Sequence, residues 1–517
     1  MSQTSQTEFE TAARAALNAR EASEIVRRYQ QGLGRPIISA ELNGFRLVAV
    51  GKVVKWSKGW RFFTDFLIDH LKDTIGRTWA TQALREGKEH PVFEWLRTMN
   101  SVVTANRSTN GTGAFQSTCK GHLGALWRLG YALYLIEHND QMDAKIVKRL
   151  RSPVSFRATY HETQIASVFA ISGFRLKMAE MGRTSSASPE FWATRAGGTR
   201  YAVEAKCKDR WKSAIPIESD EFRNELRQWV RDQLYNASIK KLENAVYCFE
   251  LSLLADLDAD QWKDVAGQIR TVLSEAENLK IKGKPPVPAY VIVTNNVDVL
   301  AHQEFTSNRV AMLFGFCMDD WFENGVEVEI EKAFDSHDKH RDIHSIFKCL
   351  EEIEEIPQSF DGTPTILDEN GIEIRMQVAV GAQIEYPDAT GSPRKGIVYD
   401  VTTANEEAWL CVESDGEHHI VKMPLEKHEV EAVQKYGNAV FGKPEEKQKD
   451  LGGDPFKFYD WISSVYAKYD RDGLLVQVKD HKDFETISAL STEALRVRAA
   501  REVTKAAIAT SGRAGKV

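Results

Sequence analysis

The chain has 517 residues, of which 42% are hydrophobic and 27% are charged, and its formal net charge is −7. These values are typical of globular proteins, and the length suggests roughly three domains. The negative balance excludes a protein that coats nucleic acid over its whole surface, although a local basic site stays open.

Targeting and cysteine patterns predict a cytoplasmic protein. The first ten residues lack both a basic region and an apolar segment, so no secretory signal is predicted. The longest apolar stretch, residues 123–136, contains Arg128 and is too short to cross a bilayer. The six cysteines are scattered without a Cys-x-x-Cys pair, which favours free thiols over a disulfide framework.

Residues 1–150 are predicted to form a mostly helical first domain. A helix is expected over Thr7–Gln31, followed by a hairpin over Pro36–Lys55 with its turn at Asn43-Gly44. The segment Asn106–Ser117 is rich in Gly, Ser, Thr and Asn, which predicts a loop. We expect the tryptophans of this region in its core rather than as base-stacking platforms: Trp56, Trp60, Trp79, Trp95 and Trp127.

Residues 155–300 contain a regular series of predicted elements. Apolar residues at helical spacing end near Ile171, and two short strands follow, Phe174–Met178 and Phe191–Arg195. A Gly197-Gly198 turn then leads into a returning strand over Tyr201–Cys207. The remaining elements alternate between helix and strand: Glu221–Leu242, Val246–Ser252, Ala259–Leu279 and Pro288–Thr294. The order is therefore α-β-β-β-α-β-α-β, which predicts a mixed α/β fold.

The returning strand places a carboxylate and an amine two residues apart. Because side chains alternate along a strand, Glu204 and Lys206 share one face while Ala205 turns to the other. Charges on a buried strand are costly unless they have partners. Glu190 opens the preceding strand, so two carboxylates on adjacent strands can hold a divalent cation and a water against a phosphodiester.

This spacing carries a resemblance to a known family. Pro189-Glu190 and Glu204-Ala205-Lys206 resemble the PD-(D/E)xK signature of the restriction-endonuclease-like nuclease superfamily. The predicted order of elements over residues 155–296 is also similar to the αβββαβ core of that superfamily, with one further unit. The same acid-x-Lys tripeptide recurs outside such a strand context, at Glu86, Asp143, Glu445 and Asp480.

The resemblance implies roles for individual residues. Glu190 and Glu204 would hold Mg²⁺, or alternatively Mn²⁺, with the Ala205 carbonyl as a third ligand. Lys206 would orient or activate the attacking water. Glu162 on the preceding helix would supply a further carboxylate, and Gln233 on the following helix a supporting polar group.

Each of these roles has a plain alternative. Glu204 with Lys206 would then be an exposed charge pair on an edge strand, which contributes little to stability. Glu162 would be a solvated carboxylate in the first turn of a helix, and Gln233 a surface residue. In addition, Glu190 stands where the signature usually has Asp. Its longer side chain predicts altered metal preference, because Mg²⁺ demands near-ideal octahedral geometry.

Basic side chains gather around the motif. Residues 193–213 hold six basic and two acidic groups, a local balance of +4. A second basic run over residues 145–157 precedes the motif helix. Phosphate contact and a solvated charged face are both compatible with these clusters. The predicted contacts to nucleic acid, beside Gln233, are Arg195, Arg200, Lys208, Arg210 and Lys212.

The remainder of the chain predicts three further regions. Residues 301–365 form a helical connector with a helix over Arg341–Glu355 and a linker from Pro357 to Thr365. Short alternating runs over residues 374–430 predict a small SH3-like or Tudor-like β-barrel that binds protein or DNA. Residues 444–517 are predicted to be helical. A zinc site at His337, His340 and His344 is a minor alternative.

The sequence thus predicts a Mg²⁺-dependent DNA nuclease, an endonuclease on double-stranded DNA, with accessory domains that govern cutting. Defence against foreign DNA fits such an enzyme, a homodimer is compatible with it, and no membrane partner is expected. Two other classes stay open: a catalytically silent nucleic-acid-binding protein, and a scaffold that binds proteins.

Overall fold

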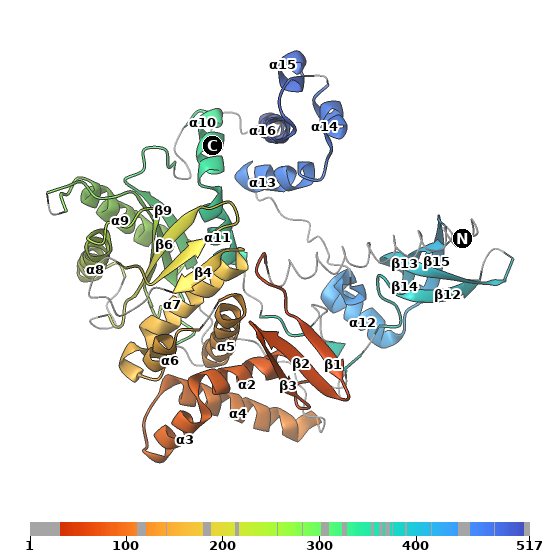
Figure 1. Ribbon diagram of the computed structural model, residues 1–517, viewed down its shortest axis with the longest axis horizontal. Coiled ribbons are helices and arrows are strands. Elements are labelled where there is room, and N and C mark those ends of the chain that lie inside the picture. The colour runs from red at the N-terminus through yellow and green to blue at the C-terminus, as the bar shows by residue number, and fades with distance from the viewer. Residues whose placement is uncertain are drawn as a thin grey trace. The chain divides into compact units, whose positions relative to one another are not determined.

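The computed structural model of the chain describes residues 32–110, 120–140, 142–178, 188–211, 217–255, 257–281, 283–300, 310–322, 328–352, 356–360, 366–367, 373–374, 376–387, 390–414, 416–442, 455–479 and 481–510. The chain divides into two compact units. Figure 1 labels their helices and strands. The first consists of Met1–Cys317 and Ile346–Glu445, and the second of Met318–Ser345 and Glu446–Val517. Among the helices of the described stretches, none has the length and apolarity that crossing a membrane requires.

The first unit begins with a three-stranded antiparallel sheet of β1 (Ser39–Leu42), β2 (Phe45–Val50) and β3 (Val53–Ser57). Asn43 and Gly44 join β1 to β2 with φ angles of 50° and 74°. This left-handed backbone is what a two-residue hairpin turn requires, so the predicted hairpin is confirmed. The helix predicted over residues 7–31 lies outside the described residues.

A series of helices follows the hairpin: α2 (Phe63–Ile75), α3 (Arg77–Arg85), α4 (Pro91–Asn110), α5 (Gly121–Asn139), α6 (Ala144–Leu150) and α7 (Pro153–Ile171). The loop predicted from Asn106 is wrong for residues 106–110, because α4 continues to Asn110. The Asn106 side chain bonds back to the helix, since its Nδ2 donates to the Val102 carbonyl at 2.8 Å. Residues 111–117 of that predicted loop lie outside the described residues.

The helices pack around an aromatic core that includes Trp95 and Phe156. Trp60 is also buried, and Trp79 and Trp127 pack against the core. The core position predicted for Trp56 is wrong, because this side chain lies on the edge strand β3 and is 65% exposed.

A six-stranded mixed sheet forms the centre of the first unit, with its strands in the spatial order β4 (Arg175–Met178), β5 (Phe191–Thr194), β6 (Arg200–Cys207), β7 (Ala245–Glu250), β8 (Ala289–Asn295) and β9 (Val310–Phe316). Strands β4, β5 and β6 are antiparallel, β6, β7 and β8 are parallel, and β9 is antiparallel to β8. The predicted order of elements and the mixed α/β class are confirmed. The edge strand β9 is an addition that sequence reasoning missed.

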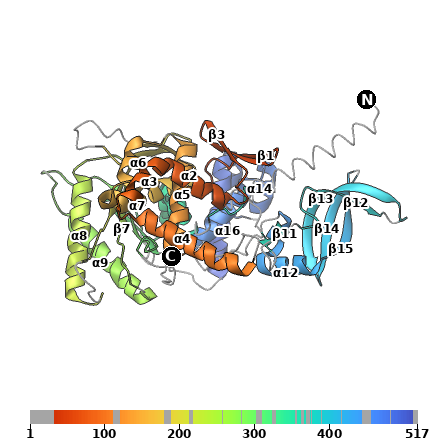
Figure 2. The same cartoon turned by 90° about the horizontal axis from the view of Figure 1, so that it is seen from below.

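Helices cover both faces of this sheet. α8 (Asp220–Ser238) and α9 (Ala259–Glu277) lie side by side (Figure 2) and share a core with Ala202, Tyr247 and Val291. α7 covers the other face, where its Phe169 ring lies 5.6 Å from the ring of Phe191 on β5. Side chains of successive β6 residues therefore face different helices.

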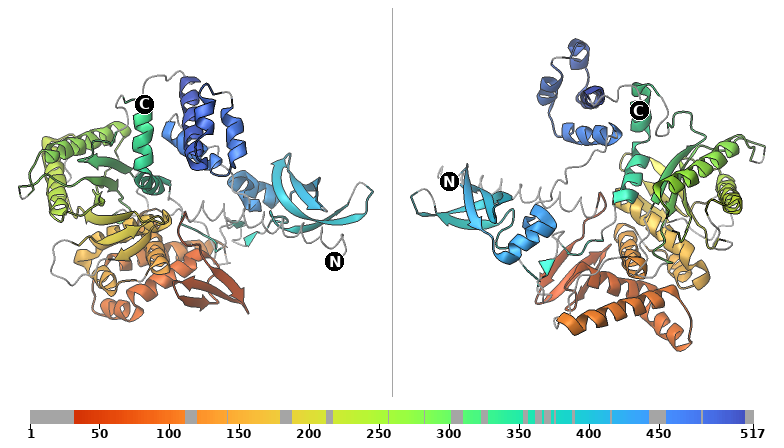
Figure 3. Two further views of the ribbon diagram at one scale, coloured as in Figure 1. Left: turned by 45° about the horizontal axis from the view of Figure 1, so that its top comes forward. Right: turned by 180° about the vertical axis from the view of Figure 1, so that it is seen from behind.

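The carboxyl-terminal part of the first unit contains a four-stranded antiparallel sheet (Figure 3) of β12 (Gln383–Pro387), β13 (Pro393–Ala404), β14 (Glu407–Ser414) and β15 (Glu417–Pro424). The strand pair β10 (Ile366–Leu367) and β11 (Glu373–Ile374) precedes it, and α12 (Lys427–Tyr436) and the 3₁₀ helix η1 (Gly437–Phe441) follow. The prediction of several short strands over residues 374–430 is confirmed. Among the described residues β12 and β15 are both edge strands, so the sheet is open rather than a closed barrel.

The second unit is helical over its described residues and contains α10 (Ile330–Lys339), α13 (Pro455–Tyr466), α14 (Arg471–Val478), α15 (Phe484–Ser488) and α16 (Thr492–Thr510). Its core includes Phe334, Tyr459 and Leu495. α11 (Arg341–Glu352) continues from this unit into the first. The helices predicted after residue 444 are confirmed from Pro455 to Thr510.

Candidate functional site

The structure brings Glu190, Glu204 and Lys206 together at the point where β5 begins beside β6. Lys206 Nζ lies 2.9 Å from Glu190 Oε1 and 3.1 Å from Glu204 Oε2. The hairpin produces this geometry, because the Glu190 N–H donates to the Val203 carbonyl at 2.9 Å and so aligns Glu190 across from β6. One ammonium therefore bridges two carboxylates from adjacent strands.

Burial makes this cluster different from a surface ion pair. The Glu204 side chain is fully buried, and the Glu190 and Lys206 side chains are 16% and 26% exposed. Burial lowers the pKa of Lys206, but the charges of Glu190 and Glu204 outweigh this effect and raise the pKa overall. The plain alternative of an exposed pair on an edge strand is therefore wrong, since β6 lies inside the sheet between β5 and β7.

Ala205 places its backbone, rather than its side chain, toward Glu190. The N–H groups of Ala202 and Lys208 donate to β7 and its flanking residues, so even-numbered residues of β6 turn their backbone groups to that side. The Val203 carbonyl turns the other way and accepts the Glu190 N–H. By the same alternation the Ala205 carbonyl points to the edge at which Glu190 lies.

Glu162 lies in the middle of α7 and faces the same cluster. It is buried and forms an ion pair with Arg149. Burial raises the pKa of Glu162 to about 7, with a further rise from the negative charge of Glu190 and opposition from Arg149. The alternative of a solvated first-turn carboxylate is wrong. The helix begins at Pro153, a residue suited to the first position of a helix.

Lys240 is a member of the cluster that sequence reasoning missed. Its ammonium donates to Glu204 Oε1 at 2.5 Å and to the Ser188 carbonyl at 2.9 Å. The sequence predicts a helix through residue 242, which would place Lys240 on a helix surface. In the structure α8 ends at Ser238, and Lys241 takes a positive φ of 52°, which turns the chain toward Glu204.

The predicted nucleic-acid contacts are dispersed. Arg195 and Arg200 lie at the turn end of the β5–β6 hairpin, and Arg200 packs over the Trp192 ring at 3.8 Å. Since a strand rises about 3.3 Å per residue, this end lies on the order of 20 Å from Lys206. The structure therefore does not bring these two arginines to the carboxylates.

The other predicted contacts have varied surroundings. Lys208 forms an ion pair with Glu225 at 2.8 Å, which joins β6 to α8. Arg210 is exposed, Gln233 is half-buried on α8, and Lys212 lies outside the described residues. Arg149, part of the second basic run, is directed to Glu162 rather than to an open phosphate site.

The donor set of the cluster suits a hard divalent cation, since it consists of carboxylates and a backbone carbonyl. The charges are already balanced: three carboxylates, those of Glu162, Glu190 and Glu204, face three cations. These cations are Arg149, Lys206 and Lys240. The space between the Glu190 and Glu204 carboxylates attracts positive charge, and the Lys206 ammonium occupies it. A bound metal ion therefore requires the Lys206 ammonium to shift.

Among the described residues no three or more His, Cys, Asp or Glu side chains are arranged to hold a metal ion, so Glu162, Glu190 and Glu204 do not form a three-carboxylate metal site in this arrangement. The histidines considered for zinc have other contacts. His337 contacts Asp460 at 2.9 Å, His340 contacts Asp320 at 3.5 Å, and the rings of His337 and His344 stack at 4.6 Å. The zinc interpretation gains no support from this arrangement.

Comparison with known proteins gives no relative for this chain. No protein-family model, curated protein or solved structure matches it. Because a fold by itself does not determine an activity, function is inferred from the site. The resemblance to the nuclease superfamily therefore rests on the sequence motif at Glu190, Glu204 and Lys206 and on the order of helices and strands around it.

Proposed function

We propose that the chain is a metal-dependent endonuclease that hydrolyses phosphodiester bonds of double-stranded DNA. The carrying observation is that Glu190 and Glu204, on adjacent strands, converge on the Lys206 ammonium inside the central sheet. The αβββαβ order around them supports a nuclease-like core. The open sheet β12–β15 would be an SH3-like accessory module that contacts protein or DNA.

In this proposal Glu190, Glu204 and the Ala205 carbonyl hold Mg²⁺, with Glu162 as the additional carboxylate. A bound Mg²⁺ supplies charge neutralisation at the phosphate and acidifies a water molecule. Mn²⁺ would be the alternative ion, because the longer side chain at Glu190 relaxes the octahedral geometry that Mg²⁺ demands.

The residues of the chain contribute positioning and charge. Lys206 keeps a proton on Nζ, because its raised pKa holds it charged, and it steadies negative charge that develops on the phosphate. Lys240 neutralises Glu204 and fixes the Ser188 carbonyl, which positions the segment that carries Glu190. Glu162 must be ionised to bind a cation, and because its pKa without a metal ion is raised to about 7, metal binding through Glu162 should strengthen as the pH rises through 7.

The test is cleavage of supercoiled and linear double-stranded DNA by the full chain with Mg²⁺, with Mn²⁺ and with a chelator. We expect metal-dependent cleavage that falls by about 10³-fold in Glu204→Ala and in Lys206→Ala. Lys88→Ala is a matched control, because Lys88 belongs to the same acid-x-Lys tripeptide but forms an exposed ion pair with Glu86.

A catalytically silent DNA-binding protein is the second candidate. The observation that favours it is the charge balance of the cluster, where Lys206 and Lys240 already neutralise the buried carboxylates. Binding of DNA in a gel-shift assay without cleavage in either metal ion would support this candidate and reject the nuclease.

A further inference from the structure

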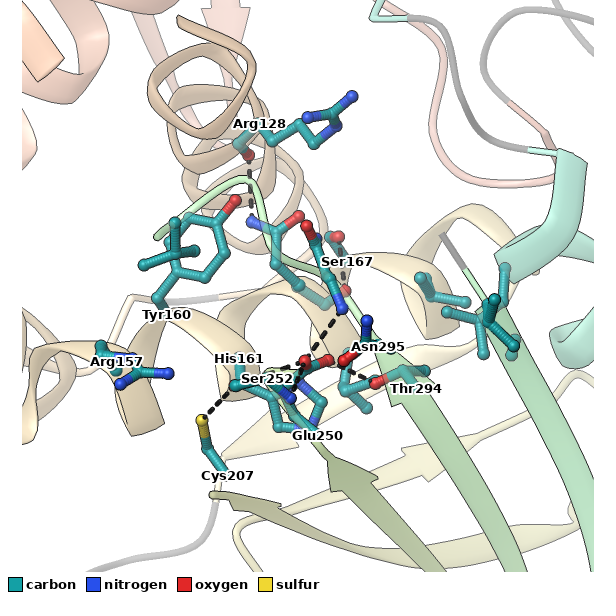
Figure 4. Close-up of a pocket in the computed structure, with 18 of the residues that line it drawn as sticks. Arg128, Arg157, Tyr160, His161, Ser167, Cys207, Glu250, Ser252, Thr294 and Asn295 are labelled. Carbon is teal, nitrogen blue, oxygen red and sulfur yellow. Dashed lines mark hydrogen bonds between the residues drawn. The ribbon is translucent and has the colours of Figure 1, made fainter. Parts of the chain in front are cut away.

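A cavity of about 460 Å³ lies on the α7 face of the central sheet, at the carboxyl ends of β6, β7 and β8 (Figure 4). Cys207 and Glu250, which are register partners on β6 and β7, line it together with Thr294 on β8. Because Cys207 alternates with Lys206 along β6, these two side chains leave the strand on opposite faces. His161 of the cavity wall and Glu162 of the carboxylate cluster are nevertheless consecutive residues of α7. The volume is within the range of about 300–1,000 Å³ that small-molecule sites occupy.

The floor of the cavity is fixed by hydrogen bonds. Glu250 accepts from the backbone N–H groups of Ser252 and Asn296, each at 2.9 Å, and from Thr294 Oγ1 at 2.7 Å. Asn295 Oδ1 accepts the Leu253 N–H at 2.7 Å. These contacts tie the loops after β7 and β8 together, so the cavity is formed before any ligand binds.

Polar groups at the wall retain hydrogen-bonding capacity. The Tyr131 hydroxyl is buried and has no hydrogen-bond partner among the described residues. His161 Nε2 lies 3.3 Å from the Cys248 carbonyl, which assigns the ring proton to Nε2 and leaves Nδ1 as an acceptor. Gln164 adds an amide, whose nitrogen donates to the Arg128 carbonyl at 3.3 Å.

The cationic groups at the cavity are already engaged. Arg128 forms an ion pair with Asp298, and Arg157 forms one with Asp209. Beside polar residues such as Ser167, the wall has an apolar part from α7, β9, α11 and nearby segments: Ile165, Val168, Val299, Val310, Leu350 and Ile356. A ligand that fits these surroundings is uncharged, has an apolar body and carries an edge with both donors and acceptors.

We propose that this cavity binds a free, uncharged nucleoside. A nucleobase combines a flat, weakly polar body with adjacent hydrogen-bond donors and acceptors, which match the Tyr131 hydroxyl, His161 Nδ1 and the Gln164 amide. The ribose has room in a cavity of about 460 Å³. This inference is independent of the nuclease proposal, since it requires neither DNA nor a metal ion.

The test is calorimetric titration of the full chain, without metal ions, with adenosine, guanosine, cytidine and uridine and with their 5′-monophosphates. We expect at least one nucleoside to bind with Kd below about 1 mM. Its monophosphate should bind more weakly, because the arginines at the cavity already have carboxylate partners. Tyr131→Phe should weaken the nucleoside about fivefold, as expected for the loss of one hydrogen bond.

Tyr134→Phe is the matched control. Tyr134 lies one turn along α5 with a buried hydroxyl that likewise has no partner among the described residues, but it does not line the cavity. This variant should bind the nucleoside like the wild type. The proposal is overturned if none of the four nucleosides binds, if both tyrosine variants lose affinity equally, or if the monophosphates bind more tightly than the nucleosides.

Discussion

The same acid-x-Lys tripeptide occurs at Glu86-Gly87-Lys88 and at Glu204-Ala205-Lys206, and the two regions have opposite physical characters. Lys88 lies 2.6 Å from Glu86 just after α3, and both side chains are exposed. Glu204 is fully buried in β6 and contacts two ammonium groups. A pair of charges at this spacing becomes a candidate site only when a strand buries it and brings a second carboxylate to it.

The largest expected difference between the two regions is in stability. Glu204→Gln leaves Lys206 and Lys240 without their buried carboxylate, and we expect a loss of about 4 kcal/mol in the free energy of unfolding. Glu86→Gln removes an exposed ion pair and should change the free energy of unfolding by less than about 1 kcal/mol. Urea denaturation of both variants measures this contrast, and equal losses would show that burial does not separate the two regions.

Glu250 gives a third case for this comparison. It is a buried carboxylate like Glu204, but its hydrogen-bond donors are uncharged groups rather than ammonium groups. Burial raises its pKa to about 7, from an ordinary value of 4.5. A raised folded-state pKa stabilises the protein below pH 4.5, and this stabilisation is lost as the pH rises through 7. We expect a decline of up to about 3 kcal/mol across that window.

Denaturation of wild type and Glu250→Gln between pH 4.5 and pH 7 isolates this contribution. The variant cannot ionise at this position, so its stability should decline less with pH than that of the wild type. Parallel curves for the two proteins would contradict the assignment of the decline to Glu250.

A smaller loss of stability is expected when Lys240 is replaced. Lys240 is the second cation that contacts Glu204, whereas the ion pair of Glu86 contains Lys88 alone. Lys240→Met removes the contacts to Glu204 and to the Ser188 carbonyl, and we expect a loss of about 2 kcal/mol. Because a competing ammonium is removed, Mg²⁺ should bind more tightly. Denaturation and calorimetry measure the two effects, and Lys88→Met, which should change neither, is the control. Weaker Mg²⁺ binding in Lys240→Met would contradict a competing role for this ammonium.

Local sequence signals were sufficient for the strands and turns that position the motif. The alternation around Glu204, the Gly197-Gly198 turn and the Pro189-Glu190 pair correctly indicated a hairpin that brings Glu190 next to Lys206. Both glycines take positive φ angles, 118° and 99°, which fits a turn that other residues would adopt with strain.

The positions of the other cluster residues depend on tertiary packing, which the local sequence around them does not reveal. The segment after Ser238 contains neither Gly nor Pro, yet Lys241 and Asn244 adopt positive φ angles that end α8 early and place Lys240 against Glu204. Arg149 resembles a phosphate-binding residue in a basic run, but its partner Glu162 lies on the next helix. The open edges of the sheet β12–β15 likewise follow from strand pairing rather than from strand pattern.

Calorimetric titration of Mg²⁺ into wild type, Glu204→Gln and Glu86→Gln tests the central claim most directly. We expect one Mg²⁺ site in the wild type and in Glu86→Gln, and its loss in Glu204→Gln, because only Glu204 belongs to the buried carboxylate pair. Absence of Mg²⁺ binding to the wild type, or equal binding to Glu204→Gln, would contradict a metal site formed by Glu190 and Glu204.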